Sequence, residues 1–314
     1  MSKVAFIFPG QGAQYVGMGR ELAGQVPSVA RRFQQMNELL GFDLTQLCWE
    51  GPEEELKKTA NQQPAILAFS LACLELLTEQ GIKPDVVAGL SLGEYSALVA
   101  AGVLTFEEAV PLVRKRGTYM QEAVPVGMGG MAAVLGLSND QVDQICADAS
   151  AQTGLHVEGA NYNCPGQIVI SGHTEAVAHA MELASAAGGK TVKLSVTAPF
   201  HSKLLVRAGE MLAGALDEIV LQDARVPVVA NVTADYVTDA GAIRGLLIEQ
   251  VSKPVRWEES IRRLIGDGVE TFIEVGPSKA LSSFMKKIDR SVRVFNIEDA
   301  QTLGKVLDSV GRVC

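Results

Sequence analysis

The sequence predicts an α/β fold with a mostly parallel, buried sheet and a ferredoxin-like subdomain inserted into it. Short apolar and β-branched runs alternate with longer stretches of helical period, which is typical of a parallel sheet covered by helices. One internal segment instead has the element order βαββαβ, the ferredoxin-like arrangement. With 314 residues, 47% of them hydrophobic, the chain can bury one large core or two smaller ones.

The main sheet is predicted from four runs that lack polar alternation, as expected for strands buried on both faces. They lie at residues 4–8, 85–89, 226–232 and 271–276. Residues 64–81 and 203–216 carry apolar side chains at helical spacing, so we expect helices there.

The segment that begins at Val124 follows a different pattern, opened by the glycines and proline of VPVGMGG. Strands are expected at 131–137, 155–162, 167–172 and 190–196, with helices at 138–152 and 173–189. We therefore expect a ferredoxin-like (βαββαβ) subdomain at 125–198, inserted into a body formed by residues 1–124 and 199–314.

Composition and charge exclude several kinds of function. A net charge of −9 disfavours nucleic acid as a partner, although local basic clusters could still meet an anionic one. No apolar run approaches the ~20 residues of a membrane helix, so neither a membrane segment nor a signal peptide is expected. Scattered cysteines without a C-x-x-C pair predict no disulfide framework, no metal site and a reducing, cytoplasmic setting. They are Cys48, Cys73, Cys146, Cys164 and Cys314.

Two glycine-bearing segments look like nucleotide-binding motifs but do not fit them. GKT at 189–191 lacks the first glycine of a P-loop, because Ala184 stands there, and it opens a strand instead of a helix. GQGAQY at 10–15 follows a strand, but Tyr15 replaces the third glycine of the dinucleotide fingerprint. The second loop is either an ordinary turn or one whose backbone N–H groups stabilise an oxyanion.

GLSLG at 89–93 matches G-x-S-x-G, the nucleophile elbow of α/β-hydrolase-like folds. It follows a predicted strand and precedes a helical stretch, as the motif requires. Ser91 would project from a sharp turn, and the Leu92 N–H at the helix N-terminus would favour an oxyanion. The alternative is a serine that only caps the helix. The context favours the nucleophile and an α/β-hydrolase-like core.

A serine nucleophile needs a base, and the chain has four histidines. His156, His173 and His179 lie in or at the start of predicted regular elements, where structural or solvent-facing histidines are common. His201 lies in a proline-bearing loop at the exit from the predicted subdomain, and cleft residues gather at such junctions. His201 is therefore the candidate base.

Arg116 ends the basic run at 114–116. Such a run is usually a solvated helix face. The alternative is a guanidinium that turns inward and binds a carboxylate through two parallel hydrogen bonds, which lysine could not reproduce.

Taken together, these segments resemble the malonyl-CoA:acyl carrier protein transacylases, which share their fold with the acyltransferase domains of fatty acid and polyketide synthases. The resemblance covers nearly the whole chain, in order. Its segments are FPGQGAQYVGMG, QPAILAFSLA, GLSLGEYSALVAAG, RGTYMQEA, GGMAAVLGL, NCPGQIVISG, APFHS, VVANVTA, IEQVSKPVRW and EVGPSKAL.

The resemblance implies a ping-pong transfer of malonyl from malonyl-CoA to the phosphopantetheine thiol of acyl carrier protein. Ser91 would accept the acyl group, and His201 would be its base, oriented by the backbone carbonyl of Gln250. The N–H groups of Gln11 and Leu92 would form the oxyanion hole, and Arg116 would bind the malonyl carboxylate. No metal or other cofactor is implied, and a monomer is expected.

Two positions next to the candidate nucleophile and base are notable: Leu90 offers no polar contact, and Phe200 bears on selectivity. Many members of the family have a histidine before the serine, where this chain has Leu90. Phe200 precedes the candidate base, and phenylalanine at that position accompanies malonyl in the synthase domains. Its ring should crowd an α-methyl branch, although one methyl group is worth only about 1 to 3 kcal/mol.

Two other functions stay open. A serine esterase or thioesterase would use the same elbow and pass the acyl group to water, and a catalytically silent protein could dock acyl carriers. The sequence leaves the pathway and the preferred carrier undefined.

Overall fold

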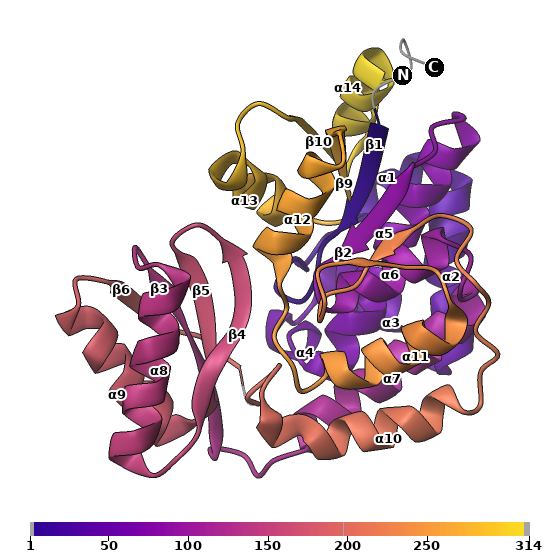
Figure 1. The fold of residues 1–314 in the computed structure, drawn as a ribbon. Helices are drawn as coiled ribbons and strands as arrows, with labels where there is room; N and C mark the ends of the chain where they lie inside the picture. Colours follow the sequence, from indigo (N-terminus) through magenta and orange to yellow (C-terminus); the bar gives the residue numbers. More distant parts are fainter. Residues whose placement is uncertain (1–2, 197, 311–314) are drawn as a thin grey trace.

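The protein, described here from a computed structural model, is built around two sheets (Figure 1). The structure describes residues 3–196 and 198–310. The main sheet has the strand order β10-β9-β1-β2-β7-β8. Its strands are β1 (Lys3–Phe8), β2 (Val86–Gly89), β7 (Val228–Val229), β8 (Tyr236–Val237), β9 (Val269–Val275) and β10 (Arg293–Ile297).

The main sheet is parallel except at one edge. β1 pairs in parallel with β2 and with β9, and β7 and β10 extend the sheet in parallel on either side. Only β8 pairs antiparallel, with β7. The carboxyl ends of β1, β2, β7 and β9 therefore meet at one edge, the place where open α/β sheets bind ligands.

Both faces of the main sheet are buried, and the side chains of β1 point alternately into one core and the other. Phe6 and Phe8 belong to one core, and Ala5 and Ile7 to the other. The first core is closed mainly by the helices α1 (Arg20–Gln25), α2 (Pro27–Leu40), α3 (Leu44–Glu50), α4 (Glu53–Leu56), α5 (Thr59–Glu79), α6 (Leu92–Ala100), α7 (Phe106–Glu122), α10 (Val206–Leu216), α11 (Ala240–Gln250) and α14 (Ala300–Val310). The second is closed by α12 (Trp257–Gly266) and α13 (Ala280–Ile288).

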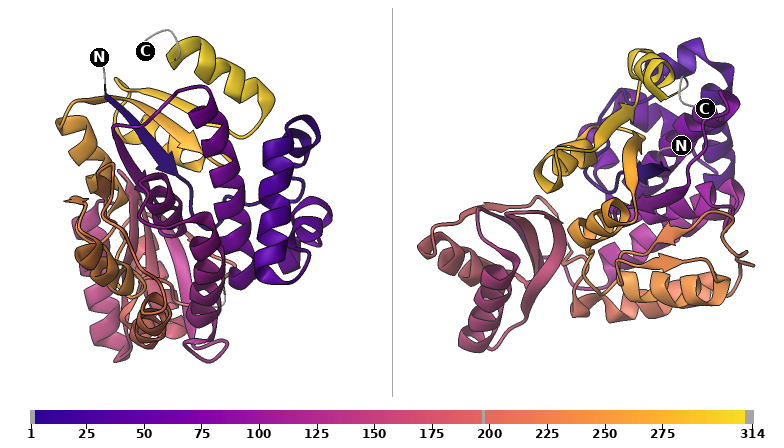
Figure 2. Two further views of the ribbon diagram at one scale, coloured as in Figure 1. Left: turned by 90° about the vertical axis from the view of Figure 1, so that its right-hand side faces the viewer. Right: turned by 45° about the horizontal axis from the view of Figure 1, so that its top comes forward.

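The second sheet is antiparallel, with the strand order β4-β5-β3-β6, and lies beside the main body (Figures 1 and 2). Its elements are β3 (Gly129–Leu135), α8 (Asn139–Thr153), β4 (Val157–Cys164), β5 (Gln167–His173), α9 (Thr174–Ala186) and β6 (Lys190–Lys193). Ala132 and Val134 pack under the two helices, whereas Met131, on the opposite face, joins the core of the main body. One face of this sheet is thus turned toward the main body.

The predicted α/β class, the mostly parallel main sheet and the βαββαβ order are confirmed. The run at 226–232 forms only the two-residue strand β7, and the strands β8 and β10 were not predicted. The helix expected at 203–216 begins with a 3-10 turn, η1 (Lys203–Leu205). The division into 1–124 with 199–314 and 125–198 stays a prediction.

Several expected features concern what the chain lacks. Over residues 3–196 and 198–310, no helix is long and apolar enough to cross a membrane. The same residues contain no cluster of three or more side chains suited to a metal ion. Cys48, Cys73, Cys146 and Cys164 are free and buried, and Cys314 lies outside the described residues.

Candidate active site

Ser91 lies on a strained turn between β2 and α6. Its φ of 52° and ψ of −103° place it in the left-handed region that residues with a side chain rarely adopt. The flanking glycines are required because the turn is so tight. A Cβ on Gly89 would lie 2.0 Å from the backbone of Gly93, and one on Gly93 would lie 2.1 Å from the Phe8 carbonyl oxygen. Helix α6 therefore starts directly against the ends of β1 and β2.

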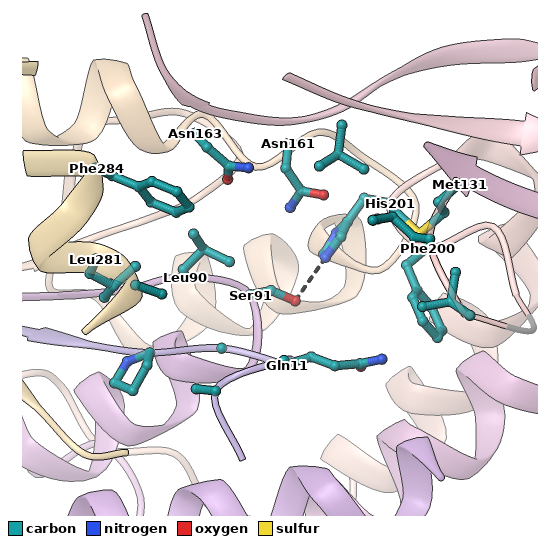
Figure 3. A pocket seen from close by; sticks show the side chains of 18 of the residues that line it. Gln11, Leu90, Ser91, Met131, Asn161, Asn163, Phe200, His201, Leu281 and Phe284 are labelled. Carbon is teal, nitrogen blue, oxygen red and sulfur yellow. Dashed lines mark hydrogen bonds between the residues drawn. The ribbon is translucent and has the colours of Figure 1, made fainter. Parts of the chain in front are cut away.

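Ser91 and His201 form a hydrogen-bonded pair. Their Oγ and Nε2 atoms are 2.7 Å apart (Figure 3). On the other side of the ring, Nδ1 lies 2.8 Å from the carbonyl oxygen of Gln250. A carbonyl can only accept, so Nδ1 carries the proton and Nε2 accepts from the serine hydroxyl. Burial, reinforced by the charge of Arg116, lowers the pKa of His201 to about 4, so the ring is neutral at neutral pH.

Arg116 reaches the same serine from α7. A capping box between Thr105 and Glu108 fixes the start of this helix. Three turns on, the Arg116 guanidinium is only 1% exposed and donates to Ser91 Oγ at 3.1 Å. The structure therefore rules out a solvated side chain at this position, and burial lowers the pKa of the guanidinium.

Two glutamines hold the guanidinium in place. Gln63, on α5, accepts from one terminal nitrogen at 2.9 Å, and the side chain of Gln250 accepts from the other at 2.8 Å. The remaining nitrogen, Nε, is buried with no hydrogen-bond partner among the described residues. The guanidinium beside Ser91 is thus a desolvated cation that is held by neutral groups, which favours an anionic ligand.

The pocket next to the serine has a volume of about 250 Å³. Gln11 enters it from the loop after β1, and Leu92 begins α6, whose first N–H groups have no acceptor within the helix. Both candidate oxyanion-hole residues therefore lie at the elbow. Phe200 and Leu90 also line the cavity, and Figure 3 shows them on different sides of Ser91.

The pocket is lined by residues from the segment with the second sheet and by residues from the rest of the chain. Met131, Asn161, Asn163, Val169, Leu194 and Val196 come from the segment with the second sheet, whereas Ala280, Leu281 and Phe284 come from α13. The other three histidines lie elsewhere. His156 contacts Glu158, the Nδ1 of His173 accepts from the His156 N–H, and His179 contacts Gln152.

The buried hydrogen-bond network around Ser91 and Arg116 includes three polar residues that were not predicted: Gln63, Glu94 and Asn231. All are at most 3% exposed. Gln63 and Glu94 stand within apolar helical stretches of the sequence, and a polar residue on a buried helix face could have indicated a buried network. Asn231 follows a buried strand and gives no comparable pattern.

A strained serine paired with a neutral histidine and a buried arginine is an arrangement typical of acyl-transferring enzymes that use a serine nucleophile. Residues 5–311 match the family described as acyl transferase domain. The chain belongs to this family and, within it, to the malonyl CoA-acyl carrier protein transacylases. It is 51% identical to the malonyl CoA-acyl carrier protein transacylase of Bacillus subtilis over 304 residues, which cover 96% of each chain. The transacylase of Salmonella typhimurium is 43% identical, over 98% of this chain and 99% of its own.

Solved structures show the same fold. An acyl carrier protein S-malonyltransferase from Vibrio cholerae is 42% identical, with a TM-score of 0.94 over 97% of this chain and all of its own. A malonyl-transacylase in complex with a type II polyketide synthase acyl carrier protein is 41% identical, with a TM-score of 0.95 over 98% of this chain and 99% of its own. The core is α/β-hydrolase-like and carries a ferredoxin-like subdomain, as predicted.

Proposed function

We propose that this protein transfers the malonyl group of malonyl-CoA to the phosphopantetheine thiol of acyl carrier protein, supplying extender units for fatty acid or polyketide synthesis. The observation that carries the proposal is the contact of 3.1 Å between the buried Arg116 guanidinium and Ser91 Oγ. The contact supports the proposal because a guanidinium can bind a carboxylate, and this one lies next to a serine that is paired with a histidine. The names of the relatives support the same substrates.

The reaction proceeds in two halves through a malonyl-Ser91 ester. His201 Nε2 takes the hydroxyl proton as Ser91 Oγ attacks the thioester carbonyl. The resulting oxyanion accepts hydrogen bonds from the N–H groups of Gln11 and Leu92. When the tetrahedral intermediate collapses, the C–S bond breaks and His201 returns the proton to the leaving CoA sulfur. The carrier thiol then repeats these steps in reverse and releases Ser91.

The carboxylate of malonyl would replace the contacts that Arg116 now makes with neutral oxygens. Two charge-assisted hydrogen bonds orient the acyl chain and reward only substrates with a terminal carboxylate. An acetyl group would leave the cation buried and unpaired. In this scheme the CoA thioester is a substrate, and no metal or redox cofactor takes part. The buried free thiols support a reducing, cytoplasmic location.

The decisive experiment follows the fate of the acyl group on Ser91. Purified protein is mixed with malonyl-CoA, and the intact mass is measured before and after a carrier with a free phosphopantetheine thiol is added. We expect a malonyl adduct on Ser91 that persists in water and moves to the carrier. Rapid loss of the adduct without carrier would instead indicate an esterase or thioesterase.

Serine variants separate catalysis from docking. Ser91→Ala should abolish both the adduct and carrier malonylation. Ser96→Ala is a matched control, because Ser96 is also buried on α6 and its hydroxyl has no partner among the described residues. Unchanged carrier malonylation by Ser91→Ala would support the non-catalytic docking protein.

A further inference from the structure

The backbone of Ser91 needs an external support. Its φ of 52° is unfavourable for a residue with a Cβ, and such conformations persist only where the surrounding structure fixes them. The glycines at 89 and 93 make room for the turn but do not hold it. A group that bonds the turn itself must supply the holding force.

Asn231 bonds the turn on both sides of Leu90. Its Oδ1 accepts from the Ser91 N–H at 2.6 Å, and its Nδ2 donates to the Gly89 carbonyl oxygen at 2.6 Å. Asn231 follows β7, the strand next to β2, so the sheet brings it to the elbow from 140 residues away in the sequence. Both bonds are short, and the side chain is 1% exposed.

Asn231 is itself held firmly. Its N–H donates to Glu94 Oε2 at 3.1 Å, and its carbonyl accepts from the Arg256 N–H at 3.0 Å. Glu94 Oε2 also accepts from the side chain of Gln250 at 2.7 Å. The same Gln250 orients His201 through its carbonyl oxygen. Nucleophile and base are thus connected to one buried hydrogen-bond network.

We propose that Asn231 is a positioning residue that holds the Ser91 turn so that Oγ faces His201. It also occupies the Ser91 N–H, which leaves the oxyanion to the N–H groups of Gln11 and Leu92. This inference rests on the proposed acyl transfer and goes beyond it. Asn231 is not one of the residues that line the cavity, and its side chain bonds the backbone of the Ser91 turn.

The chemistry of the amide explains why asparagine is needed. Aspartate has the same shape but would place a second acceptor against the Gly89 carbonyl oxygen. Leucine fills a similar volume and provides neither bond. Each substitution leaves a buried backbone group without a partner and frees the turn to relax.

The experiment measures Asn231→Asp and Asn231→Leu in two ways. A neutral fluorophosphonate reports the reactivity of Ser91 without malonyl or carrier. Single-turnover malonylation, followed by intact mass, gives the maximal rate and the half-saturating malonyl-CoA concentration. We expect both rates to fall about 10²-fold, the effect of displacing a reacting group by about 1 Å, while half-saturation changes less than about 3-fold.

The control is Thr45→Val, which removes a hydroxyl that can donate to the Phe33 carbonyl oxygen or to the Asn37 side chain on α2 and should leave both rates unchanged. Circular dichroism checks that each variant is folded. If neither Asn231→Asp nor Asn231→Leu folds, Asn231→Ser is measured instead. A folded variant that reacts as fast as wild type, or that changes only half-saturation, overturns the inference. If wild type takes the fluorophosphonate but never malonyl, the proposed function fails while the role of Asn231 is still tested.

Discussion

The Nδ1 atom of His201 lies 2.8 Å from the main-chain carbonyl oxygen of Gln250. The base is therefore oriented by a neutral acceptor and not by a carboxylate. A carbonyl fixes the tautomer as well as a carboxylate would, but it does little to stabilise a positive ring. The nearby positive charge belongs to Arg116, which opposes protonation further. The free enzyme thus holds His201 in the form that accepts a proton.

This arrangement predicts an unusually acidic limit for activity. Protonated His201 cannot act as a base, so kcat/KM for malonyl-CoA should fall only as the pH drops through about 4. Between pH 5 and 7 the histidine should contribute no change, in contrast to an unperturbed histidine with a pKa of about 6.5. The pH profile is measured with circular dichroism at each point to confirm folding. An acid limb near pH 6.5 that persists in Glu94→Gln, which lacks the buried carboxyl beside Gln250 that titrates in this range, would contradict the prediction.

Arg116 should control the choice of acyl group. Arg116→Ala removes two charge-assisted hydrogen bonds to malonyl, so malonyl transfer should drop about 10²-fold or more while acetyl transfer falls less or rises. Arg116→Lys should recover only part of the malonyl transfer lost in Arg116→Ala, because an ammonium cannot bind both carboxylate oxygens in parallel. The ratio of malonyl to acetyl transfer is measured. Lys115→Ala, which removes an exposed lysine paired with Glu218, is the control and should keep the wild-type ratio.

Phe200 should limit branched substrates. Phe200→Ser makes room beside His201, so the preference for malonyl over methylmalonyl should weaken about 10-fold, as expected for one methyl group. Phe284 lines the same cavity on the other side of Ser91 (Figure 3). Phe284→Ser should therefore leave that preference unchanged. Equal shifts in both variants would show that the ring at 200 has no special role.

Glu94 should make stability depend on pH. Burial raises the pKa of Glu94 from 4.5 to about 7, against the opposing effects of its hydrogen bonds and Arg116. As pH rises from 4.5 to 7, the unfolded chain loses this proton while the folded protein keeps it, so folding becomes less favourable.

Glu94→Gln removes this titration. The stability of wild type relative to the variant should decrease by about 3 kcal/mol between pH 4.5 and 7. Urea unfolding at several pH values measures the difference. A difference that stays constant with pH would mean that Glu94 has the same pKa in the folded and unfolded protein.

Local patterns were enough to predict the fold class, the central strands of the main sheet and the βαββαβ order of the second, but not most helices of the main body. The long apolar runs at β1, β2 and β9 are visible because strands buried on both faces have few polar residues. β7 was overestimated, since only Val228 and Val229 pair as a strand before the chain turns toward Asn231. β10 was missed because its sequence, RVFNI, mixes polar and apolar residues at the sheet edge.

Site residues were predictable in two situations: where a motif carries its own local geometry, and where the chain offers few residues of the required type. Ser91 stands in a glycine-framed elbow, and His201 was found because the chain offers few alternatives. Arg116 could not be assigned to the surface or the interior from its basic run. The roles of Gln63, Glu94 and Asn231 arise from hydrogen bonds between residues that are 53 to 140 positions apart in the sequence. No local pattern encodes such contacts.

The pocket is lined by residues from two different stretches of the chain. Gln11, Ser91 and Phe284 lie on segments that carry the main sheet and its helices, whereas Met131, Asn161 and Val169 come from the contiguous segment with the second sheet. Exchanging that single segment between relatives would replace several residues that line the pocket. The Ser91 turn and Arg116 would stay unchanged. Changes confined to that segment can therefore reshape part of the pocket while Ser91, His201 and Arg116 keep their contacts.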